Sequence, residues 1–468
     1  MSGTHWSEGR NEKSQRERET EMNASTLESL STKLNRITEM ARQSPTFQFR
    51  TLAHLVNPQS MEEAFGQLKR NAAAGIDGVT VREYEQNLAG NLASLHARLK
   101  QGSYRAQPMR RVYIEKEDKK QRPLSIPVIE DKIVQRAVVE ILNRIYENDF
   151  LPCSYGYRPG RNAHDAVEAI REKAITGKVS FILDADIRDF FGSIDRGKLM
   201  EVLQRRVTDK DLLRIIGKWL HVGVMEEGRL LNAENGVYQG SVVSPILANL
   251  YLHVVLDEWV EHTVKPRMRG EIALFRFCDD FIVCFQYRDD AEKFQKVLPK
   301  RFERFGLTLH EEKTKLIEFG RFANQSARRR GQKPATFKFL GFVFYGGTTL
   351  KGKYCVKLKT ISKRLGRKLN EVWQWCRAHR HDPIWRQRIH LRQVMKGHYN
   401  YYGRRTNFAC LLQFSRGVQR TWKFWLGRRG QKSSYSWEQF HQLLQRYPLP
   451  QPNITQNWQR KQLPLLVR

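Results

Sequence analysis

The stretch ALFRFCDDFIVCF, Ala273–Phe285, consists of two apolar, β-rich runs joined by the adjacent aspartates Asp279 and Asp280. Two ionised carboxylates on neighbouring residues repel each other, and apolar surroundings increase that cost unless a cation lies between them. A divalent metal ion is the natural partner, because Mg²⁺ takes oxygen ligands, often one or two carboxylates together with substrate phosphates. The stretch therefore predicts a β-hairpin that carries half of a phosphoryl-transfer site.

A strand upstream supplies a candidate for the other half. In residues 179–195 the apolar positions alternate from Phe181 to Ile187, which places Asp184 and Asp186 together on the opposite face of the strand. Either carboxylate can face the hairpin from a neighbouring strand and complete a cage for two metal ions about 3.5–4 Å apart. The alternative is structural, because aspartates are common at β-turns for conformational reasons alone.

The charge of the chain predicts a polyanionic partner. The 468 residues include 81 Lys+Arg against 49 Asp+Glu, a formal net charge of +32, and the sequence pI is about 10.1. Aromatic residues are interleaved with the basic ones in the C-terminal part, a mixture that suits phosphate neutralisation together with base stacking. The alternative is a solvated basic surface that serves solubility.

The six cysteines are scattered without a CxxC pair, so we interpret them as buried free thiols in a reducing compartment. No apolar run approaches the roughly 20 residues needed to span a bilayer, and the N-terminus is too polar for a secretory signal. These features predict a cytoplasmic protein with no membrane partner.

The pattern along the chain changes near Gly347. Residues 1–24 are charged and lack apolar periodicity, which is typical of a disordered polar tail. Up to residue 346 the pattern mixes helices with strand-like runs, and after it the chain becomes mostly helical and basic. Residues 321–339, with Gly, Pro and an Arg run, are expected to form an exposed loop. The expected strands are residues 110–114, 179–187, 273–277, 281–285 and 339–345.

These residues resemble a known family. FCDD resembles the Tyr/Phe-x-Asp-Asp box of reverse transcriptases, and DADIRDFF (184–191) resembles the aspartate box of their first palm strand. Further blocks resemble, in order, those of the bacterial group II intron-encoded reverse transcriptase/maturase family: AGIDGVT (74–80), RPLSIPVIEDKIVQRAV (122–138), SYGYRPGRNAHDA (154–166), QGSVVSPILANLYLH (239–253), GLTLHEEKTK (306–315) and FKFLGFVF (337–344). LRQVMKGHYNYYG (391–403), RTWKFWLGRRG (420–430) and YPLPQP (447–452) are similar to the thumb and maturase domain of that family. The resemblance covers about residues 50–455.

The resemblance implies an α+β fold with the right-hand shape of a polymerase: fingers, a palm with an antiparallel sheet, and an α-helical thumb and maturase domain. The expected division is a disordered tail (1–24), N-terminal extension and fingers (25–175), palm (176–346) and helical thumb and maturase domain (347–468). The implied function is RNA-directed DNA synthesis that also serves the splicing and mobility of a group II intron. The implied partners are the intron RNA, an RNA/DNA primer-template, dNTPs and a target DNA. A homodimer is compatible with the sequence, although no heptad or apolar seam supports one.

The resemblance also assigns the carboxylates. Asp186 and Asp279 would hold two Mg²⁺ ions, with Mn²⁺ as an alternative, Asp280 would be a weaker or indirect participant, and Asp184 would be a neighbour. The primer 3′-hydroxyl then attacks the α-phosphate of a dNTP while the metal ions neutralise the developing charge.

Five more residues are expected at the nucleotide. Lys116 and Arg122 flank a turn in the fingers and suit triphosphate oxygens, Phe191 matches the aromatic residue that excludes a ribose 2′-hydroxyl, and Gln239 precedes a tight turn. Lys313 is a candidate proton donor to pyrophosphate or a charge stabiliser. The plain alternatives are solvated charges for the three cations and core packing for Phe191.

Four positions depart from the family pattern: Cys278, Tyr238, Ser125 and Gly192. None of them removes an expected metal ligand, so the sequence still predicts an active enzyme. No Cys/His-rich endonuclease segment follows the thumb blocks, and we expect no second-strand DNA cleavage by this chain alone.

Three other functions fit parts of the sequence. A catalytically weak RNA-binding maturase would share the fold, but it has no reason to retain the repulsive carboxylate cluster. A reverse transcriptase without an intron, acting in DNA repair or phage defence, is not distinguished by the protein sequence. A two-metal nuclease would leave the fingers and thumb blocks without a purpose.

Overall fold

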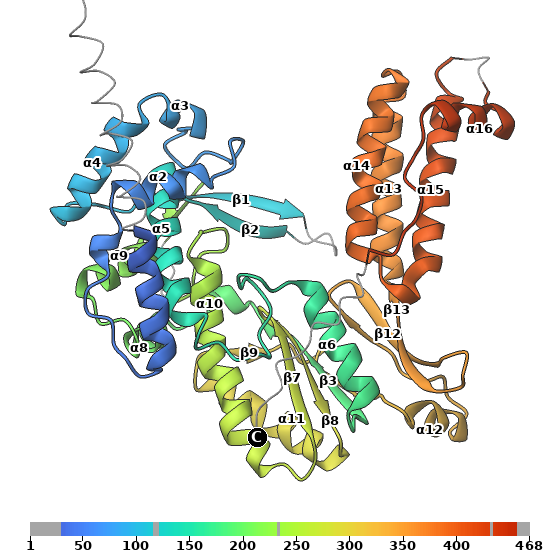
Figure 1. Cartoon of the computed structure of the whole chain (residues 1–468), viewed down its shortest axis with the longest axis horizontal. Helices are drawn as coiled ribbons and strands as arrows, with labels where there is room; N and C mark the ends of the chain where they lie inside the picture. The colour runs from blue at the N-terminus through green and yellow to red at the C-terminus, as the bar shows by residue number, and fades with distance from the viewer. Residues whose placement is uncertain (1–29, 116–120, 232–234, 431–433, 456–468) are drawn as a thin grey trace, which may run out of the picture.

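The computed structural model describes residues 30–115, 121–231, 235–430 and 434–455. In Figure 1 the N-terminal helices lie on one side, an antiparallel sheet lies centrally below them, and the C-terminal helices stand on the other side. Helices together with mostly antiparallel sheets confirm the α+β class. The predicted tail, 1–24, lies outside the described residues.

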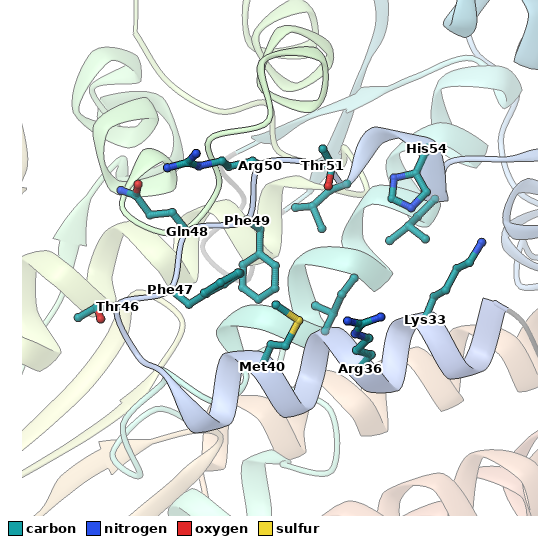
Figure 2. A pocket seen from close by; sticks show the side chains of 13 residues that line it. Lys33, Arg36, Met40, Thr46, Phe47, Gln48, Phe49, Arg50, Thr51 and His54 are labelled. Carbon is teal, nitrogen blue, oxygen red and sulfur yellow. The ribbon is translucent and has the colours of Figure 1, made fainter.

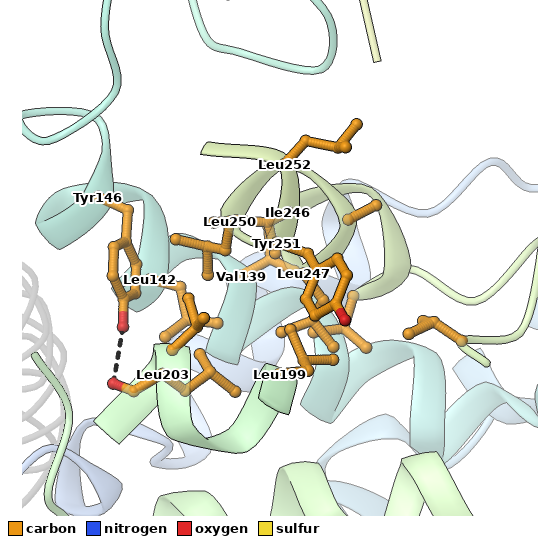
Figure 3. Close-up of a cluster of buried hydrophobic side chains, with 14 of the residues drawn as sticks. Val139, Leu142, Tyr146, Leu199, Leu203, Ile246, Leu247, Leu250, Tyr251 and Leu252 are labelled. Carbon is orange, nitrogen blue, oxygen red and sulfur yellow. Dashed lines mark hydrogen bonds between the residues drawn. The ribbon is translucent and has the colours of Figure 1, made fainter. Parts of the chain in front are cut away.

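The N-terminal helices pack around α5 (Ile129–Tyr146), which is buried over most of its surface because apolar residues occur on nearly all of its sides. In Figure 3, Tyr146 of α5 donates a hydrogen bond of 2.9 Å to the carbonyl of Leu203, and side chains of α8 and α10 pack beside it. The helical elements up to α10 are a helix over residues 30–43, η1 (Ala53–Leu55), α2 (Pro58–Gly66), α3 (Val81–Glu85), α4 (Leu88–Lys100), α6 (Ala163–Thr176), α7 (Phe190–Ser193), α8 (Arg196–Gln204), α9 (Lys210–His221) and α10 (Ser244–Leu252).

A four-stranded sheet next to these helices has the order β2-β1-β5-β6. Its strands are β1 (Met109–Glu115), β2 (Gln121–Ile126), β5 (Val224–Glu226) and β6 (Arg229–Leu231). β1 and β2 are antiparallel, with Ile114 opposite Arg122, whereas β5 runs parallel to β1. The predicted strand 110–114 is therefore confirmed, and Arg122 lies near the outer end of the hairpin.

The central sheet has the order β10-β3-β8-β7 and is fully antiparallel. Its strands are β3 (Phe181–Ala185), β7 (Ile272–Phe277), β8 (Asp280–Phe285) and β10 (Lys315–Glu318). A short pair, β4 (Ile187–Arg188) and β9 (Thr308–Leu309), continues beyond β3. Between α10 and β7 the chain forms η2 (His253–Asp257), η3 (Trp259–Val264) and η4 (Lys265–Arg267).

The two faces of this sheet are covered by different helices. Leu183 and Ala185 belong to the large core that includes α11 (Arg288–Glu303), whereas Ile182 packs in a second core with α6. This alternation confirms the predicted faces of β3. Asp184 therefore continues the face that α6 covers.

A three-stranded sheet follows, formed by β11 (Phe337–Phe339), β12 (Phe342–Thr348) and β13 (Tyr354–Thr360). The prediction of one strand over 339–345 is wrong, because Leu340 and Gly341 have φ of +45° and +85° and turn the chain between β11 and β12. Part of the expected loop 321–339 is also helical, α12 (Ala323–Arg329), because Ala323 and Ala327 are buried one turn apart.

The C-terminal helices are α13 (Ser362–Ala378), α14 (Ile384–Tyr402), α15 (Phe408–Leu426) and α16 (Trp437–Arg446), with η5 (Arg405–Asn407) before α15. The boundary predicted between residues 346 and 347 falls inside β12, and the helices begin only at Ser362. The reason is β13, where buried Val356 and Leu358 alternate with lysines in a strand pattern. The division into domains stays a prediction.

The imidazole of His398 on α14 lies in the core of these helices. It is 7% exposed, its ring centre is 3.8 Å from that of Phe414, and its Nε2 has no hydrogen-bond partner among the described residues. Burial lowers the pKa of His398 to about 4, from an ordinary value near 6.5. Between these two pKa values, His398 is therefore protonated in the unfolded chain but neutral in the folded protein.

This burial predicts a pH dependence of stability. As the pH falls from 8 to 5 the unfolded chain binds a proton at His398 and the folded chain does not, so the free energy of unfolding should fall by about 2 kcal/mol from this group. The His398→Phe variant keeps the ring stacking and should lose that share of the pH dependence. Urea denaturation of both proteins at pH 8 and pH 5 measures it, and equal pH dependence in the two would contradict the assignment.

Among the helices in the described ranges, none combines the length and apolar character needed to cross a bilayer.

Candidate active site

The predicted hairpin is confirmed, and it places both aspartates at one end of the central sheet. Phe277 pairs with Asp280 across the turn, so Cys278 and Asp279 are the two turn residues. Cys278 has φ of +60°, a left-handed conformation that is unusual for a residue with a side chain. Strain of this kind persists where the surrounding structure enforces it, often at functional sites.

Strand β3 brings Asp186 to the same end of the sheet. Ala185 is the last residue of β3 and lies opposite Phe281 of β8, so Asp186 follows at the level where β8 begins. The carbonyl of Asp186 accepts a hydrogen bond of 2.8 Å from the amide of His310, which holds the chain between β3 and β4. Asp186, directly after β3, and Asp280, the first residue of β8, thus lie at the same end of two adjacent strands.

The carboxylates at this end share one electrostatic field. Burial, with Asp184, Asp279 and Asp186 nearby, raises the pKa of Asp280 to about 7. Burial and then Asp186 raise the pKa of Asp184 to about 6. The pKa of Asp279 is also raised, mainly by burial, with Asp186 adding and Arg122 opposing. These carboxylates disfavour each other's charge, and a cation would relieve that cost.

A lysine of the protein forms an ion pair with one of these carboxylates. Lys313 Nζ is 2.5 Å from Asp186 Oδ2, on the turn between β9 and β10. Within the described ranges, no group of three or more His, Cys, Asp or Glu side chains is already arranged to hold a metal ion. The donor set nevertheless fits Mg²⁺, because Asp186, Asp279 and Asp280 offer the carboxylate oxygens that this ion prefers.

Arg122, on strand β2 of the β1–β2 hairpin, lies within electrostatic range of Asp279 in the β7–β8 turn. Its charge opposes the rise in the pKa of Asp279, and it also acts on Tyr157, whose pKa is raised by partial burial and then by Cys278 and Asp279. The Tyr157 backbone has φ of +54° and the residue is 58% exposed. Arg122 and Tyr157 therefore lie near the carboxylates. The expected site residue Lys116 lies outside the described residues.

Phe191 and Gln239 are joined to β2 by one loop. The carbonyl of half-buried Phe191, in α7, accepts a hydrogen bond of 2.7 Å from the amide of Val237. The carbonyl of Gln239 accepts one of 2.6 Å from the amide of Ser125 in β2. Gly240 has φ of +105°, and a Cβ there would lie 2.7 Å from the carbonyl oxygen of Ser125. Backbone contacts therefore connect Phe191 and Gln239 to the strand that carries Arg122.

Two of the departures from the family pattern are structurally constrained. Tyr238 is buried, and its hydroxyl accepts a hydrogen bond of 3.4 Å from Arg196 Nη2. A Cβ at Gly192 would lie 2.4 Å from Asp189 Oδ2, so a side chain there requires Asp189 to move. Their effect on activity stays a prediction.

Two arginines near the carboxylates were missed by the sequence analysis. Arg364, at the start of α13, opposes the rise in the pKa of Asp280, so it lies within electrostatic range of this carboxylate. Arg276 lies inside β7 and is completely buried. An arginine in the middle of an apolar strand, as in ALFRF, was the available signal for the second.

Comparisons with known proteins show the family of this chain. A sequence model of the reverse transcriptase (RNA-dependent DNA polymerase) family matches residues 114–344. Protein YkfC of Escherichia coli is 32% identical over 275 residues, which cover 52% of this chain and 72% of that protein. The group II intron-encoded protein LtrA of Lactococcus lactis is 34% identical over 212 residues, which cover 45% of this chain and 35% of LtrA.

A 91 kDa protein of a cob intron in Schizosaccharomyces pombe is 34% identical over 210 residues, 44% of this chain and 25% of the fission yeast protein. The chain thus spans about a third or less of these two intron-encoded relatives, but most of the E. coli protein. The chain belongs to the reverse transcriptases, and within them to the group II intron-encoded reverse transcriptase/maturase family.

Proposed function

We propose that this chain is the RNA-directed DNA polymerase of a group II intron, which also binds the intron RNA and assists its splicing and mobility. The observation that carries the proposal is the meeting of Asp186, Asp279 and Asp280 at one end of the central sheet, where burial and neighbouring carboxylates raise the pKa of Asp279 and of Asp280. Two bound Mg²⁺ ions would neutralise charge that develops on the phosphate and the attacking 3′-hydroxyl.

The protein's own side chains supply the rest of the mechanism. Arg122 presents a forked guanidinium that suits the triphosphate oxygens. Phe191 would close on the sugar of the dNTP, and Gln239 would meet the nucleotide from the loop beside β2. Lys313 would turn from Asp186 to the leaving pyrophosphate, as a proton donor or as a compensating charge.

A right-hand arrangement accounts for the placement of these parts. With 25–175 as N-terminal extension and fingers, 176–346 as palm and 347–468 as thumb and maturase domain, the carboxylates belong to the palm. Arg122 then approaches from the fingers and Arg364 from the thumb, which fits the two sides of the central sheet in Figure 1.

A basic pocket at the N-terminal helix supports an RNA partner. Figure 2 shows Lys33, Arg36, Arg50 and His54 around it, together with the aromatic side chain of Phe47, which is 38% exposed. None of the residues that line it is acidic. Cations beside an exposed aromatic ring suit phosphates and an unstacked base, as single-stranded RNA offers.

Mg²⁺-dependent primer extension tests the polymerase proposal, with purified protein on poly(rA)/oligo(dT). We expect extension that chelation abolishes, and tight binding of the intron RNA in a filter assay. RNA binding without extension would instead support the catalytically weak maturase. Extension without preference for an intron RNA would support a reverse transcriptase of DNA repair or phage defence.

Phe191 should control the choice of sugar. The Phe191→Ala variant should increase ribonucleotide incorporation relative to deoxyribonucleotide incorporation by about tenfold or more, because the ring no longer excludes the 2′-hydroxyl. Competition assays with matched dNTP and rNTP pairs measure the ratio. Phe190→Leu is the control, since Phe190 is buried in the core beside it. A lower thermal midpoint with an unchanged ratio would show that Phe191 serves packing only.

A further inference from the structure

Arg276 and Asp257 form a completely buried ion pair behind the turn that carries Asp279. Both side chains have no exposed surface, and Arg276 donates to Asp257 through Nε (2.7 Å to Oδ1) and Nη2 (2.5 Å to Oδ2). Asp257 is the last residue of the π-helical segment η2, which follows α10. Local π-helical segments often occur at functional sites.

The remaining donors of the same guanidinium reach three other parts of the chain. Nη1 donates to Asn249 Oδ1 of α10 (3.0 Å) and to the carbonyl of Cys278 in the turn (3.1 Å). Nη2 donates to Ser154 Oγ, in the segment between α5 and α6 (2.8 Å). A guanidinium has five N–H donors, and these contacts use all of them.

The segment over residues 151–157 also packs against the β7–β8 turn at Cys278. A Cβ at Gly156 would lie 2.5 Å from the amide nitrogen of Cys278, so the backbone of the 151–157 segment packs directly against the turn. Asn249 Nδ2 donates to the carbonyl of Gly156 (2.6 Å), and the amide of Tyr155 donates to the carbonyl of Arg276 (2.9 Å). Contacts on both sides can therefore maintain the left-handed backbone of Cys278.

Stability alone does not account for this pair. Replacing a buried ion pair by apolar residues of similar volume is often neutral or stabilising, whereas removing one partner is strongly destabilising. The buried guanidinium of Arg276 donates one hydrogen bond to the carbonyl of Cys278, immediately before Asp279, which indicates a more specific role than stability. It fixes the peptide that joins Cys278 to Asp279.

We propose that Arg276 and Asp257 are positioning residues for the polymerase reaction, which hold the Cys278–Asp279 peptide and thereby aim the Asp279 carboxylate. This inference rests on the proposed function and extends it to groups that touch neither substrate nor metal ion. Support groups of this kind commonly change activity by about 10- to 100-fold when altered.

The Arg276→Lys variant tests the proposal, because an ammonium keeps the charge but cannot span Asp257 and the Cys278 carbonyl together. Single-turnover primer extension should slow by about 10- to 100-fold, with an unchanged dissociation constant for primer-template. Arg206→Lys is the matched control. Arg206 is buried, donates hydrogen bonds to the carbonyls of Ala41 and Ser44, and pairs with Asp149 at 3.3 Å, and none of these partners belongs to the turn at Cys278.

A double variant separates positioning from stability. Arg276→Met with Asp257→Leu replaces the pair by apolar side chains, so the thermal midpoint should recover toward the wild-type value while the single-turnover rate stays low. Recovery of both would overturn the proposal. Amide hydrogen exchange of the peptide over residues 275–285 gives a readout without catalysis: it should accelerate in Arg276→Lys and not in Arg206→Lys.

The failures of the two proposals are distinguishable. Wild-type protein that binds primer-template but extends nothing would overturn the proposed function, and the positioning inference with it. Wild-type protein that extends the primer, together with an Arg276→Lys variant of equal single-turnover rate, would overturn the positioning inference alone. Equal slowing in Arg276→Lys and Arg206→Lys would do the same.

Discussion

Replacing Asp279 with asparagine should reduce Mg²⁺-dependent primer extension by about 10³-fold or more, because a metal ligand contributes several kcal/mol to the transition state and each 1.36 kcal/mol is tenfold in rate. Asparagine keeps the size of the side chain but removes the charge that would hold a divalent cation. Asp186→Asn should have a similar effect, whereas Asp280→Asn should lose less. RNA binding should be unchanged in all three, since it depends on basic surfaces elsewhere.

The loss in Asp279→Asn should not result from unfolding. Burial raises the pKa of Asp279, so removal of its charge relieves a cost, and the thermal midpoint without Mg²⁺ should be equal to the wild-type value or higher. Asp195→Asn is a suitable control, because Asp195 caps α8 and asparagine caps helices equally well. Full extension by Asp279→Asn would show that Asp279 is not a metal ligand. Loss of extension in Asp195→Asn would show that the assay does not distinguish a site carboxylate from any other aspartate.

Local patterns predicted the strands and the turn that surround the candidate site. The apolar alternation from Phe181 to Ile187 identified the two faces of β3, because a strand with a core on each side needs that period. The paired aspartates between two β-rich runs identified the β7–β8 turn. Both features depend on residues a few positions apart, which is the range over which sequence periodicity carries information.

Features that depend on distant contacts were not predicted. Arg276 bonds residues 19, 27 and 122 positions away, and only the folded chain brings them together. The turn at Leu340 and Gly341 was hidden in an apolar run, because the left-handed backbone of Leu340 has no local signal. The strand β13 was hidden by its lysines, since their charge made the region resemble the basic helices that follow.

Replacing Lys313 with methionine should slow primer extension by about 100-fold, within the range that general acid–base groups contribute, and leave primer-template binding unchanged. Lys313 Nζ contacts Asp186 Oδ2 at 2.5 Å, and its side chain is 59% exposed. Lys313 therefore lies beside a proposed metal ligand, and its exposed side chain retains the freedom to turn toward a leaving group. Single-turnover extension measures the rate, and Lys296→Met, at an exposed lysine on α11, is the matched control.

The Lys313→Arg variant decides between the two roles of this lysine. Arginine keeps the charge but does not release its proton at accessible pH, so it should restore the rate if Lys313 only compensates charge and should fail if Lys313 donates a proton. A counter-ion role restricted to Asp186 makes a third, opposite prediction. In that case Lys313→Met would bind Mg²⁺ more tightly, because the cation no longer competes with the ammonium, and would extend at the wild-type rate when Mg²⁺ is saturating.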